Sequence, residues 1–146
     1  MSQEQSIVDL DNSLGYLLKQ TATALRVSME AVLRPLGMSI THYSCLELLS
    51  QRPGLSNSQL ARGAFVTRQS MNTLLQSLER DGYVERPAHA PSGRALPTKL
   101  TELGHEQLAK ASSAVKAIED RMLSGLDDAQ SEEFRRILNS CIQSLH

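Results

Sequence analysis

The residues whose types and spacing most clearly suit specific hydrogen bonding lie on one predicted helix, residues 68–81. Its apolar face is formed by Met71, Leu74, Leu75 and Leu78. The remaining positions are polar and almost uncharged: Arg68, Gln69, Ser70, Asn72, Thr73, Gln76 and Ser77. Asn, Gln and Arg can form paired hydrogen bonds with adenine or guanine edges, and Ser and Thr can reach bases or phosphates. A helix surface that is only solvated would contain more Glu and Lys, so this face predicts contact with DNA.

The elements around this helix predict a winged helix-turn-helix. Ser56 and Gln59 have the spacing of a capping box, which opens a short helix ending near Gly63. A brief turn follows, and Thr67 can cap the helix 68–81, which Gly82 closes. Two short strands, 83–86 and 95–100, then form a hairpin whose tip spans 87–94. Further candidate DNA contacts are Ser56, Ser58 and Thr67 at the helix starts, and Arg86 and Arg94 in the hairpin.

Helices at both ends of the chain are predicted to form a dimerisation region. Apolar residues recur every three or four positions from Asp9 to Leu36, where Gly37 ends the helix. A shorter helix runs from Thr41, its expected N-cap, to Gln51. Thr101 caps a further long helix, and an Asp127–Gln130 capping box opens the last one. These apolar stripes exceed what one small module can cover, so residues 9–36 and 101–146 predict a homodimer around a DNA-binding region, 39–100.

The charge of the chain is distributed unevenly. Residues 52–101 hold seven basic and three acidic side chains, a net charge of +4. The rest of the chain holds eight basic and thirteen acidic side chains, a net charge of −5. The basic residues are therefore concentrated where the predicted topology would meet DNA.

Composition excludes several other classes of protein. The 146 residues suffice for a single domain with its own core, without a disulfide framework or a metal. The chain has no Trp and only five aromatic residues, which disfavours a surface for stacking bases. No apolar stretch is long enough for a membrane span, and two Cys without zinc or redox spacing fit the cytoplasm. Four scattered His offer no metal site, no cofactor is implied, and no catalytic constellation is present.

The chain resembles the MarR family of winged helix-turn-helix transcriptional regulators along its whole length. The matching stretches are Leu60-Ala61, the run 78–86 (LERDGYVER), the wing Arg94 and the run 100–104 (LTELG). This resemblance implies a mainly α fold with a two- or three-stranded β-wing. It further implies a homodimer on a pseudo-palindromic operator, most often a repressor released by a small ligand or by oxidation. The family would place Arg94 in the minor groove. Two residues before it, Ser92 stands where the family commonly has Asp, so an Asp–Arg pair is missing.

The resemblance also implies an effector pocket where the first two helices meet the DNA-binding region. The polar and aromatic candidates there are Tyr16, Lys19, Arg26, His42 and Tyr43, for a small aromatic or phenolic effector. A thiol-based redox-sensing regulator is an alternative, but Cys45 lies among leucines and Cys141 on an apolar helix face. The oxidation-sensing branch of the family uses a Cys near the start of the first helix, where this chain has none. A winged-helix module that binds protein instead of DNA is the other alternative.

Overall fold

The computed structural model of the protein describes residues 7–86 and 97–146. Within these residues it contains six α-helices, two short 3₁₀ helices and one antiparallel pair of strands. In chain order these are η1 (Leu10–Asn12), α1 (Leu14–Leu33), η2 (Arg34–Leu36), α2 (Ile40–Gln51), α3 (Asn57–Gly63), α4 (Arg68–Arg80), β1 (Val84–Glu85), β2 (Lys99–Leu100), α5 (Glu102–Met122) and α6 (Asp128–Leu145). The prediction of a mainly α chain with a small wing is confirmed.

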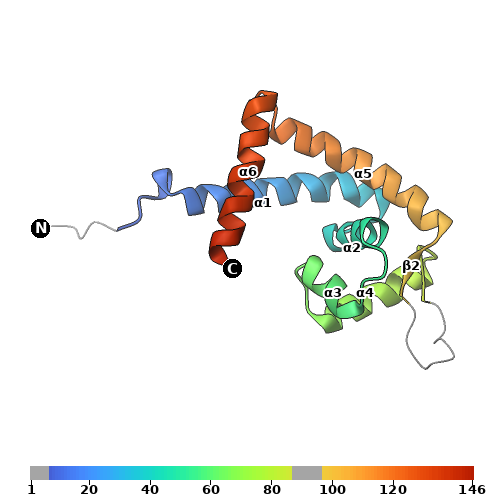
Figure 1. Ribbon diagram of the computed structural model, residues 1–146. Helices are drawn as coiled ribbons and strands as arrows, with labels where there is room; N and C mark the ends of the chain where they lie inside the picture. The colour runs from blue at the N-terminus through green and yellow to red at the C-terminus, as the bar shows by residue number, and fades with distance from the viewer. Residues whose placement is uncertain (1–6, 87–96) are drawn as a thin grey trace, which may run out of the picture.

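The two longest helices, α1 and α5, run side by side and form the upper layer of the molecule (Figure 1). Helices α2, α3 and α4 lie beneath one end of this pair, next to the strands. Two polar contacts tie the layer together: Gln107 Nε2 donates to Leu36 O at 2.8 Å, and Arg121 Nη2 donates to Ser28 Oγ at 3.0 Å. The long helices therefore form a frame against which the three shorter helices are held.

A single hydrophobic core joins the short helices to this frame. The largest fully buried side chains come from α1, α2, α3 and α4: Leu33, Cys45, Leu46, Leu60, Met71 and Leu75. Leu108 and Ala111 of α5 complete the same cluster. Because α4 is anchored by Met71, Leu75 and Leu78, its opposite face is left to solvent, as its apolar spacing predicts.

Helix α2 begins earlier than expected, because its N-cap is Ser39 and not Thr41. Ser39 Oγ accepts a hydrogen bond from the His42 amide at 3.1 Å, and His42 Nδ1 accepts one from the Ser39 amide at 3.2 Å. Gly37 has a left-handed backbone (φ 71°), which reverses the chain after η2. Two residues later, Ser39 has the extended conformation of an N-cap. The N-cap prediction is wrong here because His42 takes the role that Glu or Gln usually fills in a capping box.

The predicted helix over residues 9–36 is divided into three pieces. Ser13 caps α1 by accepting a hydrogen bond from the Tyr16 amide at 3.3 Å, and this separates α1 from η1. At the other end Pro35, which has no amide hydrogen to donate, lies in the tighter turn η2. Gly37 then ends the segment, as the sequence predicts.

The wing is shorter than the predicted strands. Val84 pairs with Leu100 and Glu85 with Lys99. Pro97 precedes this ladder and is exposed, so its missing amide hydrogen costs no strand pairing. The tip of the hairpin lies outside the described residues, and with it Arg94 and Ser92.

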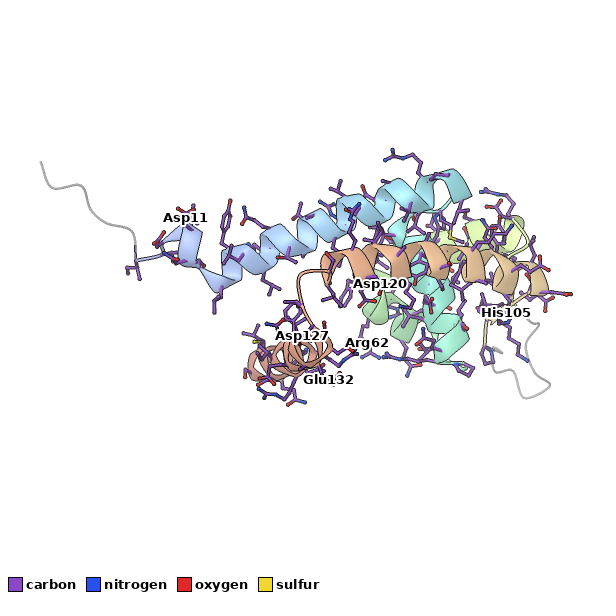
Figure 2. The ribbon with its side chains drawn as sticks, turned by 90° about the horizontal axis from the view of Figure 1, so that it is seen from above. Asp11, Arg62, His105, Asp120, Asp127 and Glu132 are labelled. Atoms are coloured by element: carbon purple, nitrogen blue, oxygen red, sulfur yellow. The ribbon has the colours of Figure 1, made fainter. Side chains whose placement is uncertain are left out.

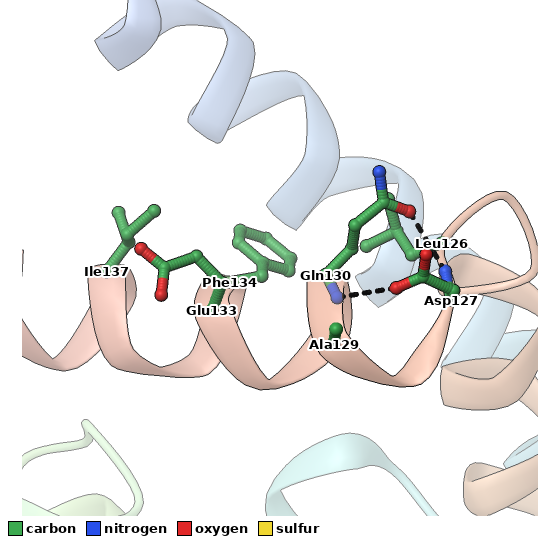
Figure 3. A pocket seen from close by; sticks show the side chains of 7 residues that line it. All are labelled: Leu126, Asp127, Ala129, Gln130, Glu133, Phe134 and Ile137. Atoms are coloured by element: carbon green, nitrogen blue, oxygen red, sulfur yellow. Dashed lines mark hydrogen bonds between the residues drawn. The ribbon is translucent and has the colours of Figure 1, made fainter.

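Helix α6 begins with the predicted capping box and extends away from the rest of the molecule, although its Phe134 and Leu138 line a hollow together with Met122 at the end of α5. The Asp127 side chain accepts from the Gln130 amide at 2.8 Å, and Gln130 Oε1 accepts from the Asp127 amide at 3.0 Å (Figure 3). Seen from above, α6 is clear of both α1 and α5 (Figure 2). None of its residues is buried, and Leu126, Phe134 and Ile137 line an open apolar groove along it. Among the described residues, no helix is both long and apolar enough to cross a membrane.

Candidate nucleic-acid interface

Helix α4 presents the predicted polar face to solvent. Its N-cap Thr67 accepts a hydrogen bond from the Ser70 amide at 3.0 Å, and its hydroxyl donates to Ser70 Oγ at 2.9 Å. The six predicted contacts on the helix are all exposed: Arg68, Gln69, Ser70, Asn72, Thr73 and Gln76. Their side chains share the side of α4 opposite its buried leucines, so the structure brings them together on one surface.

Helix α3 starts with the predicted capping box. Ser56 Oγ accepts from the Gln59 amide at 3.2 Å, and Gln59 Oε1 accepts from the Ser56 amide at 2.8 Å. Ser56 is exposed and Ser58 is half-buried in the first turn of the helix. Both lie at the positive end of the α3 dipole, where a phosphate would find amide donors.

The charged side chains of residues 48–78, which include α3 and most of α4, are all positive. Residues 48–78 contain three arginines, Arg52, Arg62 and Arg68, and no Asp or Glu. Arg52 and Arg68 are exposed, and Arg62 lies in the last turn of α3. A phosphate backbone that approached α3 and α4 would therefore meet positive charge with no carboxylate to repel it over this stretch.

The base of the wing is joined tightly to the helices on either side. Thr101 Oγ1 donates to Gly82 O at 2.6 Å, and the Thr101 amide donates to Tyr83 O at 3.0 Å. Gly104 in the first turn of α5 packs so closely that a Cβ there would lie 2.1 Å from the Tyr83 oxygen. The wing is therefore fixed to α4 and α5 at its base.

Arg86, a predicted DNA contact, is turned toward α4 in this structure. Its Nη2 donates to the backbone oxygen of Asn72 at 3.1 Å, and its Nη1 donates to Asn72 Oδ1 at 3.3 Å. Its Nε lies 4.0 Å from Glu79 Oε2 and has no hydrogen-bond partner among the described residues. The side chain is 28% exposed. This arrangement links the wing to the middle of α4 and orients the Asn72 amide, because a guanidinium can only donate.

The five candidate effector residues do not gather in one place. Tyr16 and Lys19 are exposed in the first half of α1, away from the short helices. Arg26 lines a surface hollow with residues of η2 and the start of α2. His42 lines another hollow beside Gln69, Ser70 and Thr73 of α4. Burial lowers the pKa of His42, against a smaller opposing effect of the Asp81 charge. Tyr43 is half-buried and faces Glu47.

Glu47, which sequence reasoning missed, accepts hydrogen bonds from three side chains. Tyr43 Oη donates to it at 3.0 Å, and Ser112 Oγ and Gln51 Nε2 donate as well. Burial, reinforced by the Glu47 carboxylate, raises the pKa of Tyr43 to about 12. The spacing of residues 43, 47 and 51 could have indicated contacts along α2, but Ser112 comes from α5. The cluster ties α2, beside the DNA-binding helices, to the long helix α5.

The two cysteines have different environments. Cys45 is fully buried against Met71, and burial raises the pKa of its thiol to about 12, an effect that Arg86 partly opposes. Such a thiol has little thiolate with which to react. Cys141 is exposed on α6 in the single chain. No group of three or more His, Cys, Asp or Glu within residues 7–86 and 97–146 could hold a metal.

Comparison with known proteins decides the family. A family model described as "MarR family" matches residues 36–95. The HTH-type transcriptional repressor Rv2887 of Mycobacterium tuberculosis is 46% identical over 128 residues, which cover 88% of this chain and 92% of that protein. This chain belongs to the MarR family. Its fold class and its resemblance, both predicted from the sequence, are confirmed.

Two solved structures of Rv2887 resemble this MarR-family chain in fold. Its complex with DNA has a TM-score of 0.76 and 42% identity, covering 90% of this chain and 98% of that chain. Its complex with p-aminosalicylic acid has a TM-score of 0.75 and 44% identity, covering 88% and 98%. The similarity extends beyond the helix-turn-helix to the helices of the frame.

Proposed function

We propose that this MarR-family protein is a homodimeric, sequence-specific DNA-binding repressor that a small aromatic acid releases from its operator. One observation carries the DNA-binding part: the exposed face of α4 is polar and hydrogen-bonding, inside a stretch, residues 48–78, without an acidic side chain. Rv2887, a repressor seen both with DNA and with p-aminosalicylic acid, supports repression and release by an aromatic acid. The proposed role is regulatory and not catalytic, and it places the protein in the cytoplasm with the DNA.

In this proposal the N-terminal part of α4 enters the major groove. Arg68, Gln69, Ser70, Asn72, Thr73 and Gln76 read base edges or bind phosphates, while Ser56, Ser58 and Thr67 at the helix starts face phosphates. Arg94 of the wing reaches the adjacent minor groove. Arg86 holds the Asn72 side chain of this surface in place by donating hydrogen bonds to Asn72 Oδ1 and to its backbone oxygen.

The proposed dimer uses the helices at the chain ends, 9–36 and 101–146. The apolar groove on α6 is open in a single chain, and a symmetry-related copy would cover it. The two copies of α4 would then bind two half-sites whose centres are about 34–36 Å apart on a pseudo-palindromic operator.

The test is DNA binding to the region upstream of the gene at several salt concentrations. Arg68→Ala should weaken specific binding by about 1–3 kcal/mol if the side chain pairs with a base edge. Lys116→Ala is the matched control, because it removes one positive charge from an exposed position on α5. Equal affinity of both variants and the wild type would remove Arg68 from the interface. No site preference at any salt concentration would favour a protein-binding module instead.

Effector release is tested in the same assay by adding salicylate or p-aminosalicylate. Release from the specific site at concentrations that leave nonspecific binding unchanged is the expected result. Undiminished specific binding would refute release by this class of acid while leaving DNA binding intact.

A further inference from the structure

The turn between α3 and α4 is a tightly hydrogen-bonded helix reversal. The Phe65 amide donates to Arg62 O at 3.2 Å, and the Val66 amide donates to Ala61 O at 3.0 Å. This pair of bonds is the Schellman arrangement at a helix C-terminus, which requires a left-handed backbone at the residue after the cap. That residue is Phe65, with φ of 58°.

The same reversal occurs at two other helix ends, and glycine occupies both. Gly37 follows η2 with φ of 71°, and Gly82 follows α4 with φ of 82°. The residues after them donate back to Leu33 O and Leu78 O, as Val66 does to Ala61 O. Glycine carries no Cβ and adopts this conformation without steric cost. Within the described residues, Phe65 is the only residue other than glycine with a positive φ, and a bulky residue there is strained.

The hydrogen bonds of the reversal do not depend on the side chain at this position, and the Phe65 ring gains no burial in return for the strain, because Phe65 is 94% exposed. Its neighbour Val66, by contrast, packs against the hydrophobic core. The fold would be satisfied by glycine at position 65, and it gains no burial from the aromatic ring. An outlier of this kind at a binding surface points to a role in binding.

The surroundings of Phe65 favour DNA as the partner that covers the ring. Phe65 lies two residues before Thr67, the N-cap of α4, and arginines follow and precede it by three residues, at Arg68 and Arg62. The chain has no acidic side chain from residue 48 to residue 78. A ring beside arginines, in a stretch without carboxylates, is suited to a groove of DNA, which is lined by negatively charged phosphates.

We propose that Phe65 contacts DNA and packs its ring against the 5-methyl group of a thymine at the edge of each half-site. The proposal rests on the proposed function, in which the start of α4 enters the major groove. The thymine methyl is the apolar group that a base displays in that groove, and a phenyl ring without hydrogen-bonding atoms can read it only by contact. Phe65 is then a specificity-determining residue outside the recognition helix itself.

Phe65→Gly separates this role from a structural one, because it should move stability and binding in opposite directions. Glycine relieves the left-handed strain at no loss of burial, so the Tm should rise by about 2–4 °C at equal protein concentration. Affinity for the operator should fall roughly fourfold for each thymine methyl that the ring no longer covers, or about fifteenfold for a dimer on two half-sites. Phe65→Leu, equally strained but still apolar, should weaken binding by less than about fourfold, which is less than half of the Phe65→Gly effect on a logarithmic scale.

Replacing single thymines with deoxyuridine in the footprinted operator identifies the contact, because the substitution removes only the methyl group. One symmetric pair of positions should weaken wild-type binding and have no effect on Phe65→Gly. Unchanged affinity of Phe65→Gly would overturn the proposal and leave a protein partner for the ring. A weakened variant that remains as sensitive as the wild type at every thymine would overturn the methyl contact. If the wild type itself shows no site preference, the proposed function fails and not this inference alone.

Discussion

Arg86 joins the base of the wing to helix α4, and replacing it with Met tests the strength of that link. Met keeps most of the aliphatic part of the side chain and removes the guanidinium. The substitution eliminates two hydrogen bonds to Asn72, at 3.1 and 3.3 Å, together with the approach of Nε to the Glu79 carboxylate at 4.0 Å.

The expected loss of stability is about 1–2 kcal/mol. Hydrogen bonds to a charged group contribute roughly 1.5–3 kcal/mol, but these two are long and Asn72 is exposed, so about 1 kcal/mol each is appropriate. The distant ion pair with Glu79, whose side chain is 48% exposed, adds at most a few tenths. Removing the Arg86 Nε, which is buried without a hydrogen bond in the described structure, returns part of the loss.

Urea unfolding of the wild type, Arg86→Met, Asn72→Ala and the double variant measures the coupling directly. Asn72→Ala removes the bond to Oδ1 and leaves the backbone bond, so the coupling should be about half of the Arg86→Met effect. Arg80→Met is the matched control, because that side chain is 75% exposed beside Asp81 and should cost less than about 0.5 kcal/mol. Additive effects of the two substitutions would refute the bond to Asn72 Oδ1, and an unchanged stability of Arg86→Met would refute the link as a whole. A loss of operator affinity without a loss of stability would instead place Arg86 on DNA.

Three further predictions concern the fold. Gly104→Ala should destabilise the protein by about 3 kcal/mol in urea unfolding, because its Cβ would meet a backbone oxygen at 2.1 Å, whereas Gly15→Ala on exposed α1 should stabilise it by up to about 1 kcal/mol. Folding lowers the pKa of His42, whose neutral ring accepts a hydrogen bond from the Ser39 amide at Nδ1. The contribution of His42 to stability is therefore fully present above pH 6.5 and is lost as the pH falls through the folded-state pKa. His42→Gln, which retains an acceptor, should flatten this acid-side slope, and an unchanged slope would assign it to other groups. The pKa of Cys45 rises from 9.0 to about 12 on folding, so stability should fall between these pH values by up to about 1.4 kcal/mol per unit. Cys45→Ala should lose that slope between pH 9 and pH 10, above which Tyr43, whose pKa is raised from 10.0 to about 12, adds a slope of its own. Alkylation of Cys45 in the folded protein at neutral pH would contradict its burial.

Much of the fold follows from patterns that span only a few residues. The caps at Ser56, Thr67, Thr101 and Asp127 were predictable because a cap depends on a side chain and an amide three positions away. The polar face of α4 was predictable for the same reason, since helical periodicity separates it from the buried leucines. The N-cap of α2 was missed because a His filled the capping box at Ser39.

The contacts between distant parts of the chain could not be derived in this way. Glu47 meets Ser112 only because α2 crosses α5, and Arg86 meets Asn72 only because the wing folds back onto α4. The crossing geometry of the helices also decides that Arg26 and His42 line different hollows, although both were expected near one pocket.

By itself, the sequence determined the kinds of element, their order and the side of α4 that stays polar, because local hydrogen bonding and apolar periodicity decide these. Only the tertiary structure decided which side chains from separate helices meet, and which residues gain no burial in return for strain. Phe65 shows the difference. Phenylalanine is a residue type that is usually buried, but the left-handed reversal between α3 and α4 exposes this one to solvent.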